Sequence, residues 1–476
     1  MEKVAIIGMG TSGMAVLAGY EKVVDPKEVS IDCYDTSGSL GKGYPYREDS
    51  DEVILNLKTR KISYNYEDND DLARWLEEND LQEPVYTPRN VFGDYTKSRM
   101  EDTAKKMQAN LMEEKIIRID RIEDKWELGT ESGKINKYDR VHLCCGELKQ
   151  YDYYGLKGEE NFIQEIFPLE EKLQGVQKGN ICVIGTSLTG VDVATYLLSK
   201  NRGDHITMFS RSCMIPTVRV EPVEVSINVL TMECLKKHLE EYYGRIAFEE
   251  FDALFLEELE SHGIDFEKFQ EFHMCGGIEG LERNIDSPDD LAVVQALLPP
   301  MNGIFNKVWD CMPVTDRVRF REKWHPFLTH NRSPLPLESA EILIQAKKEH
   351  RLSMVKGVGG IKKNGKYKLI MAEGKEHEIE YDYIINATGL DVRMREIEES
   401  NPLLNQLLEK RYASVCEYGG LTLVPGKMCV ISPLYGTLEN LHGHGVLAVG
   451  VQYRNNSTMM IQKTAHELIK SLYSSK

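Results

Sequence analysis

Two segments of the sequence carry glycines at the spacing that binds dinucleotides. The first, KVAIIGMGTSGMAVLAGY, starts at Lys3 and places Gly8, Gly10 and Gly13 in the pattern G-x-G-x-x-G. The first glycine of this pattern allows a tight turn, the second lets a diphosphate approach the backbone, and the third lets a helix lie close to the preceding strand. The diphosphate then sits at the positive end of that helix. The segment predicts a strand, a phosphate-binding loop and a helix.

A carboxylate follows at the place where such a loop needs one. The segment VSIDCYD reads as a second strand and ends in Asp35. An acid about 20 residues beyond the loop is placed to accept a hydrogen bond from a ribose hydroxyl. The alternative is that Asp35 only closes the turn formed by residues 36–38. The order of strand, loop, helix, strand and acid favours dinucleotide binding.

The second segment, CVIGTSLTGVDVA, repeats the first with Ser187 at the position of the middle glycine, while Gly185 and Gly190 keep the outer positions. A serine side chain fills space that phosphate oxygens need, although its hydroxyl can also donate to them. We therefore expect a second dinucleotide-binding loop, with a serine at the position of closest approach to the phosphates. Its candidate contacts are Gly185, Thr186, Ser187, Leu188 and Thr189.

An arginine stands near the end of the strand that follows this second loop. The segment HITMFSRS has Ser210 and Arg211 where the first unit has its acid. A guanidinium at this place suits a 2′-phosphate, which favours NADPH over NADH. The alternative, that Arg211 is a solvated surface residue, stays open.

The elements beyond each loop also repeat. The segment IIRIDRIEDKWELGTESGKINKYDRVHLCCG closes at Gly146, and RLSMVKGVGGIKKNGKYKLIMAEGKEHEIEYDYIINATG closes at Gly389. Both read as short antiparallel strands with turn glycines, followed by an apolar closing strand. A duplication of this order predicts an α/β protein that contains two Rossmann-like dinucleotide-binding folds.

Residues 216–346 read as a helical insertion in the second fold. Apolar residues recur there at intervals of three and four, and acids fill much of the remainder. We assign 1–175 and 376–476 to the first fold, and 176–215 and 347–375 to the second. The insertion either covers the sheet or forms a lid that sets substrate choice.

The composition argues against several classes of partner. A chain of 476 residues suggests two or three domains, and a net charge of −18 disfavours nucleic acid and anionic membranes. No apolar run is long enough to cross a bilayer, and the first strand begins too early to leave room for a secretory signal. The ten cysteines contain no CxxC pair, which argues against zinc and redox-dithiol sites and fits a cytoplasmic protein. We expect no metal and a small-molecule substrate.

Several motifs resemble those of flavoproteins with two dinucleotide sites, such as the flavin-containing monooxygenases and N-hydroxylases. The segments INATG and LCCG are similar to the paired ATG strand ends of that group, with Cys144 and Cys145 in place of alanine and threonine. More narrowly, the chain resembles a bacterial family of FAD/NAD(P)-binding proteins. The matching motifs are GKGYPY at 41–46, VILNLKTRKIS at 53–63, YTPRNVFGDY at 86–95, IGTSLTGVDVATYLL at 184–198, SRSCMIP at 210–216 and FREKWHPFLTHNRSPLP at 320–336.

This resemblance implies FAD in the first fold and NAD(P)H in the second. It places the FAD diphosphate at the first glycine loop and the adenine ribose at Asp35, and it brings further segments toward the ribityl chain and the flavin ring. In flavoproteins of this plan the last strand ends near the flavin, and the next helix, here opening at 456–458, directs its positive end toward the ring. The residues implied for FAD are Gly8, Gly10, Thr11, Ser12, Gly13, Asp35, Thr36, Gly41, Lys42, Gly43, Asn56, Gly389 and Gly450.

No acid–base pair with diagnostic spacing accompanies these motifs, and the catalytic residues are left unassigned because a flavin performs the redox chemistry itself. His325, His330 and Arg332 are candidates for contact with an anionic substrate or a nicotinamide phosphate; the alternative is that Trp324, His325 and Pro326 pack a helix end. His442 and His444 precede the expected final strand. The lack of a CxxC pair argues against a disulfide-reductase cycle.

The leading hypothesis is an FAD-dependent NAD(P)H oxidoreductase acting on a small molecule. Monooxygenation, including N-hydroxylation, and simple two-electron reduction both remain open. The alternative is an FAD-binding redox sensor or partner-binding module without turnover, motivated by Ser187 and by the missing catalytic signature. A third hypothesis, an NAD-dependent dehydrogenase without flavin, predicts a colourless protein.

Overall fold

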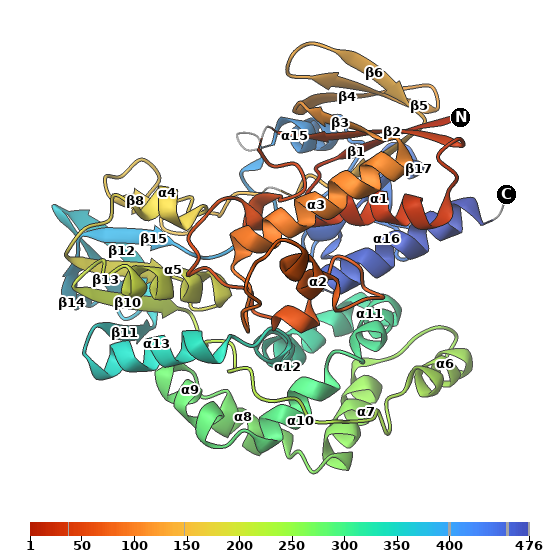
Figure 1. The fold of residues 1–476 in the computed structure, drawn as a ribbon. Helices are drawn as coiled ribbons and strands as arrows, with labels where there is room; N and C mark the ends of the chain where they lie inside the picture. The colour runs from red at the N-terminus through yellow and green to blue at the C-terminus, as the bar shows by residue number, and fades with distance from the viewer. Residues whose placement is uncertain (37, 147, 398–400, 454–456, 475–476) are drawn as a thin grey trace. The chain divides into compact units, whose positions relative to one another are not determined.

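The computed structural model describes residues 1–36, 38–146, 148–397, 401–453 and 457–474 (Figure 1). It divides into two compact units, which are described separately below. The first unit comprises Met1–Tyr151 and Leu390–Lys476, and the second comprises Asp152–Gly389.

The first unit is built on a six-stranded sheet in the order β16-β17-β7-β1-β2-β3. All neighbours in it are parallel except β16 and β17. Buried strands of a parallel sheet read as continuous apolar runs, and residues 4–7 of β1 fit this pattern. The strands are β1 (Glu2–Ile7), β2 (Val29–Asp35), β3 (Asn110–Glu113), β7 (Arg140–Leu143), β16 (Cys429–Ser432) and β17 (Gly436–Gly443).

Two layers cover this sheet. Alternate strand residues such as Val4 and Ile6 pack with the helices of one face, whereas Ala5 and Ile7 pack with a three-stranded meander and α15 on the other. The elements of the helical layer are α1 (Thr11–Val23), α2 (Asp71–Glu78), α3 (Arg89–Met107) and α16 (Thr458–Tyr473), with the short turns η1 (Tyr44–Tyr46) and η2 (Thr59–Lys61). The other layer holds β4 (Ile116–Ile122), β5 (Lys125–Thr130), β6 (Ile135–Tyr138) and α15 (Pro402–Glu409).

The second unit is built on a five-stranded parallel sheet in the order β11-β10-β9-β15-β8, with a separate meander β12-β13-β14. Its strands are β8 (Phe162–Ile163), β9 (Asn180–Ile184), β10 (His205–Ser210), β11 (Leu352–Lys356), β12 (Val358–Asn364), β13 (Lys366–Met371), β14 (Glu376–Tyr381) and β15 (Tyr383–Asn386). The helices α4 (Leu169–Leu173) and α5 (Leu188–Ser199) accompany this sheet.

The predicted duplication is confirmed at the level of topology. The first sheet contains β7-β1-β2-β3 and the second contains β15-β9-β10-β11, with a meander between the third and the closing strand in both. The two Rossmann-like folds follow the same plan, as the repeated sequence pattern predicts.

The expected domain boundaries need a correction. We assigned 152–175 and 376–389 to the first fold, but β14 pairs with β13, and β15 pairs with both β9 and β8. The closing strand of each repeat pairs with the strand that leads into its glycine loop, so β15 belongs to the second unit just as β7 belongs to the first.

The insertion predicted for 216–346 is helical from Met232 onward, whereas residues 216–231 form no helix. Its core is aromatic: the Trp324 ring contacts Phe255, Phe266 and Phe327 with centroids 4.6 to 5.8 Å apart. The helix α13 contacts α5 and β11 and so covers part of the second fold. The helices are α6 (Met232–Glu241), α7 (Phe248–Ser261), α8 (Phe266–His273), α9 (Gly277–Asp286), α10 (Asp289–Leu297), α11 (Asn302–Cys311), α12 (Val314–Arg332) and α13 (Leu337–Lys348).

Two local expectations are wrong. His325 lies inside α12 rather than at a helix end, because the helix continues past Pro326 to Arg332. The expected final strand before Gly450 is the short turn η3 (Gly445–Ala448), and the strand itself, β17, ends at Gly443. The left-handed backbone of Gly445, with φ +59°, turns the chain out of the strand. None of the described helices is long and apolar enough to span a membrane.

Candidate functional sites at the two glycine loops

The first loop leaves β1 through Gly8, which has φ +92°. A Cβ at this position would lie 2.6 Å from the carbonyl oxygen of Cys144. A Cβ at Gly13 would collide with the carbonyl oxygen of Gly8. The turn and the close approach of α1 therefore both require glycine, as the sequence predicts.

The middle glycine has a partner that the sequence did not reveal. A Cβ on Gly10 would lie 3.1 Å from Cα of Gly43, and one on Gly43 would lie 2.8 Å from Cα of Gly10. The Gly41 amide also donates to the carbonyl oxygen of Met9 at 2.9 Å. The structure thus brings segment 41–43 against loop 8–13, and the two backbones form one cradle.

Asp35, at the end of β2, accepts hydrogen bonds that stabilise this cradle. Its Oδ2 accepts from the Met9 amide at 2.6 Å, and its Oδ1 accepts from the Thr36 amide at 2.7 Å. The carboxylate therefore closes its own turn and also holds the glycine loop.

The remaining residues predicted near FAD occupy different surroundings. Lys42 forms an ion pair with Asp94 at 2.6 Å, the carbonyl oxygen of Thr11 accepts from the Tyr64 hydroxyl at 3.3 Å, and Asn56 is partly buried. A Cβ at Gly450 would lie 2.5 Å from Cys416 Sγ, so packing alone requires glycine there.

One residue of the first cradle was missed. A Cβ at Gly445 would collide with Ser12 Oγ, which places the chain just beyond β17 directly on the glycine loop. The repeat HGHG at 442–445 is the signal that marks such a close approach.

The N-terminus of α1 has the features of an anion site. Gly10 is its N-cap residue, and no side chain among the described residues caps it. The first amides of a helix lack partners within the helix and carry positive partial charge, so they favour phosphate.

The second loop repeats the first in detail. Gly185 has φ +120°, and its Cβ would lie 2.5 Å from the carbonyl oxygen of Ala387. A Cβ at Gly190 would collide with the carbonyl oxygen of Gly185. The Gly185 amide donates to Phe209 at 2.8 Å, just as Gly8 donates to Tyr34 at 2.7 Å.

Ser187 occupies the N-cap position of α5 without strain. Its backbone angles, φ −82° and ψ −174°, match the −76° and −163° of Gly10. The side chain is exposed and makes no capping hydrogen bond, and Leu188 and Thr189 begin the helix behind it. The first amides of α5 therefore lack a side-chain cap, as those of α1 do.

The side chains beside this loop differ from those of the first. Thr186 Oγ1 lies 2.7 Å from both Ser210 Oγ and the carbonyl oxygen of Met214, in the place of the contact between Met9 and Asp35. Arg211 is exposed after β10, and Gly389 follows β15 with φ +80°.

The thiols near the first cradle are protonated at neutral pH. Burial raises the pKa of Cys144 well above its usual range and raises the pKa of Cys145 to about 12. Thiolate chemistry at this pair is therefore disfavoured. Across the described residues, no group of three or more His, Cys, Asp and Glu side chains is arranged to hold a metal.

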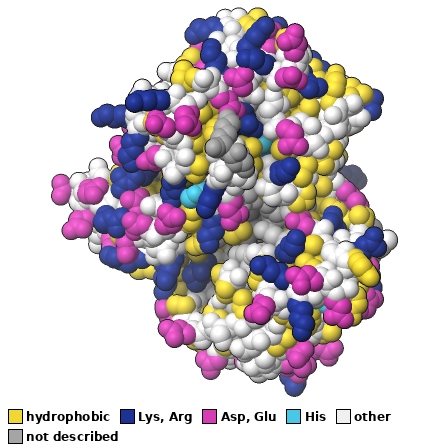
Figure 2. Space-filling model, turned by 90° about the vertical axis from the view of Figure 1, so that its right-hand side faces the viewer, with side chains coloured by type: hydrophobic (Ala, Val, Ile, Leu, Met, Phe, Trp, Pro, Cys, Tyr) yellow, Lys and Arg dark blue, Asp and Glu magenta, His cyan; other side chains and the backbone are white. Residues whose placement is uncertain are grey.

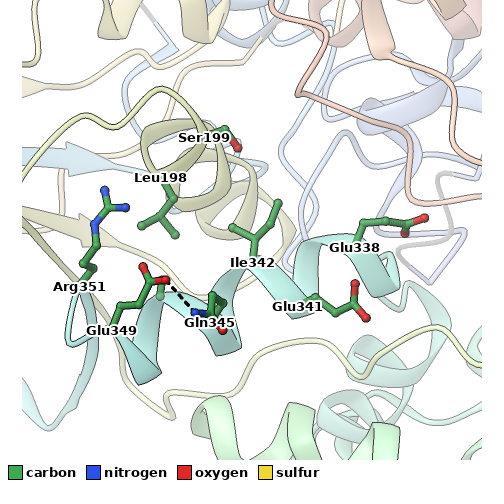
Figure 3. Close-up of a pocket in the computed structure, with 9 residues that line it drawn as sticks. Leu198, Ser199, Glu338, Glu341, Ile342, Gln345, Glu349 and Arg351 are labelled. Carbon is green, nitrogen blue, oxygen red and sulfur yellow. Dashed lines mark hydrogen bonds between the residues drawn. The ribbon is translucent and has the colours of Figure 1, made fainter.

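A hollow of about 510 Å³ on the second unit lies away from its glycine loop (Figure 3). Leu198 and Ser199, at the carboxyl end of α5, form one wall, and α13 supplies the acids Glu338 and Glu341. The loop lies at the opposite end of α5, about 16 Å away at 1.5 Å per residue. The hollow is therefore not the dinucleotide site.

His330 makes a contact within its own helix, α12. Its Nδ1 donates to the carbonyl oxygen of Pro326, one turn earlier, at 2.6 Å. Burial lowers the pKa of His330, and Arg332 lies over the Phe305 ring at 4.9 Å.

A comparison with known protein families agrees with the first of these loops. Residues 5–148 match the family model described as FAD-NAD(P)-binding. A search of curated protein sequences found no match.

Three solved structures illustrate the similarity of fold. The ornithine hydroxylase of Pseudomonas aeruginosa is 14% identical with a TM-score of 0.55, over 99% of each chain. The ornithine N-hydroxylase of Kutzneria sp. 744, solved with reduced FAD, NADP+ and L-ornithine, is 12% identical with a TM-score of 0.55, over 100% of this chain and 99% of that one. The bacillithiol disulfide reductase of Bacillus cereus is 11% identical with a TM-score of 0.50, over the same shares. At these identities the likeness shows the fold.

Proposed function

We propose that the protein is an FAD-dependent NAD(P)H oxidoreductase, with FAD in the cradle of the first unit and NAD(P)H at the loop of the second. The observation that carries this proposal is the pair of glycine loops built to one design, the first of which lies in the segment that matches an FAD-NAD(P)-binding domain.

The first cradle fits the FAD diphosphate. The uncapped start of α1 offers Thr11 and Ser12, and the contact between Gly10 and Gly43 keeps side chains out of the space before it. Asp35 is placed at the strand end where the motif puts a ribose. FAD bound here supplies the redox chemistry, and these residues hold and orient it.

The second loop fits a nicotinamide dinucleotide by the same logic. Ser187 has the backbone angles of Gly10, and its hydroxyl is able to donate to a phosphate oxygen because it is exposed and does not cap α5. Arg211 carries the preference for NADPH, since its exposed guanidinium is available for a 2′-phosphate.

We further propose hydroxylation of a small basic molecule as the reaction. The support is twofold: a net charge of −18 favours cationic ligands, and two structural neighbours act on ornithine. The second support is an analogy of fold. The free cysteines throughout the described residues fit a reducing compartment, so we place the protein in the cytoplasm.

Anaerobic mixing with NADPH tests the proposal. The purified protein is expected to be yellow, and NADPH is expected to bleach its flavin band within seconds. A yellow protein that neither NADPH nor NADH bleaches would favour the alternative, a flavin-binding redox sensor or partner-binding module. A colourless protein that takes up no FAD would contradict the proposal.

A further inference from the structure

A line of buried polar side chains crosses the first unit between its sheet and its helices. The Tyr20 hydroxyl lies 3.0 Å from His142 Nε2, and His142 Nδ1 lies 3.0 Å from His444 Nε2. In the other direction the Tyr20 ring meets the Tyr473 ring edge-on with centroids 5.7 Å apart, the two hydroxyl groups interact, and Tyr473 donates to Glu2 at 2.8 Å. Five side chains thus form one continuous polar line.

The strand register explains why this line lies on the helical face. His142 on β7 pairs with Ile6 on β1, and Ile6 packs with Tyr20 of α1 and Ile469 of α16. Side chains at paired positions share a face. The polar line therefore runs inside an otherwise apolar layer, where a polar group costs free energy unless it is bonded.

The two ends of the line reach different surroundings. Glu2 stands at the start of β1 and keeps 18% of its side chain exposed. His444 follows β17 at the carboxyl edge of the same sheet, and the next residue, Gly445, packs on Ser12 of the cradle. The line therefore connects the solvent-exposed edge of the sheet with the edge that carries the proposed FAD site.

The Glu2 carboxylate determines which group is the donor in each hydrogen bond of the line. The ionised Glu2 carboxylate can only accept, so Tyr473 donates to it, Tyr20 donates to Tyr473, and His142 Nε2 donates to Tyr20. His142 Nδ1 then accepts from His444 Nε2. Each inner group both donates and accepts, which is the requirement for passing a proton along the line.

The imidazoles of the line are neutral. Burial, together with the neighbouring imidazoles and Arg140, lowers the pKa of His142 well below its usual value, and burial lowers the pKa of His444 to about 3. The charged groups that face the line are Arg140, which binds Glu2 at 3.0 Å, and Glu2 itself. Neutral groups pass a proton without requiring a permanent charge in the core.

We propose that Tyr473, Tyr20, His142 and His444 relay protons between Glu2 and the cradle of the first unit. This inference rests on the proposed function. Oxidation of NADPH by oxygen, NADPH + H⁺ + O₂ → NADP⁺ + H₂O₂, consumes one proton in addition to the transferred hydride. The relay supplies that proton from solvent, and the donor direction that ionised Glu2 imposes is the one left after a proton has moved from Glu2 toward His444.

A neighbouring histidine provides a matched control. His442 stacks on His142 with ring centroids 5.0 Å apart and is equally buried. Its Nε2 accepts from Arg140 at 2.8 Å, so its Nδ1 faces the Lys427 carbonyl oxygen at 3.2 Å as a donor. A guanidinium does not give up its proton, and a carbonyl has none to give, so His442 lies outside the relay.

The test compares Tyr20→Phe with His442→Gln in the FAD-loaded protein. NADPH first reduces the protein without oxygen, and oxygen is then admitted as the acceptor. Tyr20→Phe is expected to be reduced at the wild-type rate but reoxidised about 100-fold more slowly, the lower range of what a positioned proton donor contributes. Its reoxidation is also expected to accelerate with buffer concentration, whereas His442→Gln behaves as the wild type.

The outcomes separate the two proposals. A protein that binds no FAD, or that NADPH and NADH fail to reduce, overturns both the function and the relay. A reducible Tyr20→Phe variant that is reoxidised at the wild-type rate, without dependence on buffer, overturns the relay alone.

A second measurement needs no turnover and no variant. In protein labelled with ¹⁵N-histidine, NMR is expected to show a scalar coupling across the hydrogen bond between His142 and His444, and neutral imidazoles at pH 6. Absence of the coupling, or charged rings at that pH, would overturn the relay.

Discussion

At the scale of single residues, the first cradle depends on glycines that face backbone rather than flexible side chains. Gly13 meets the carbonyl oxygen of Gly8, and Gly10 meets Cα of Gly43. The sequence motif predicts the need for glycine at both positions. It could not show that Gly10 faces Gly43, because that contact joins segments more than thirty residues apart.

Substitution of Gly13 by alanine tests this packing. The new methyl group would force the loop away from α1, and overpacking of this kind costs about 1–3 kcal/mol. We expect a lower melting temperature and loss of FAD on gel filtration. Gly175→Ala is the matched control, since its Cβ meets nothing within 4 Å. Retention of FAD by Gly13→Ala at the wild-type level would contradict the account of the cradle.

Arg211 allows a separate test of cofactor preference. Removing its guanidinium is expected to weaken NADPH binding about 10-fold or more, given about 1.5–3 kcal/mol for a charged hydrogen bond. NADH lacks the 2′-phosphate and is expected to bind Arg211→Ala nearly as well as the wild type. Titration of both nucleotides measures the ratio, and equal losses for the two would remove the preference for NADPH.

Gly445 and Asp35 make contacts that the sequence motifs do not predict. The motif predicts a ribose contact for Asp35, and the structure adds a contact that the motif does not predict, from the Met9 amide of the loop to the Asp35 carboxylate. Gly445 was not predicted at all, because its reason is the contact with Ser12, which only the folded sheet creates.

At the scale of elements, the strand, glycine loop and helix of each unit follow from apolar runs and glycine spacing. The element after β17 could not be predicted in this way, because the segment VLAVG has the residue pattern of a strand when its surroundings are unknown. Its actual turn, η3, follows from the left-handed Gly445 and from the amide of Leu447, which bonds to His444 at 3.2 Å. The predicted boundary of the second fold was wrong for a similar reason, since only the pairing of strands shows that β14 and β15 belong to the second unit.

Strands β7 and β17 carry a prediction for the dependence of stability on pH. Burial and Arg140 lower the pKa of His442 to about 3, whereas in the unfolded chain it titrates near 6.5. The unfolded state therefore binds more protons below pH 6.5, and the native state loses stability as the pH falls.

Urea unfolding of the wild type and His442→Gln at two pH values measures this effect. The free energy of unfolding of the wild type is expected to drop by about 2 kcal/mol more than that of the variant between pH 7.5 and pH 5. Parallel losses in the two proteins would show that His442 is charged in the native state.

At the scale of the whole molecule, charge and topology limit the function without naming the reaction. On the face drawn in Figure 2, Lys and Arg side chains are intermixed with Asp and Glu, which does not resemble a surface for nucleic acid. The same fold serves an ornithine hydroxylase and a bacillithiol disulfide reductase. The sequence could therefore predict two dinucleotide folds, but not the substrate, because function depends on the site rather than on the fold.

The most direct test of the central claim is the uptake of FAD by the purified chain. The protein is incubated with excess FAD, passed through a desalting column, and its flavin absorbance is compared with its concentration. The account predicts one FAD per chain in the wild type and a clear loss in Gly13→Ala. A wild-type protein that elutes colourless would contradict it.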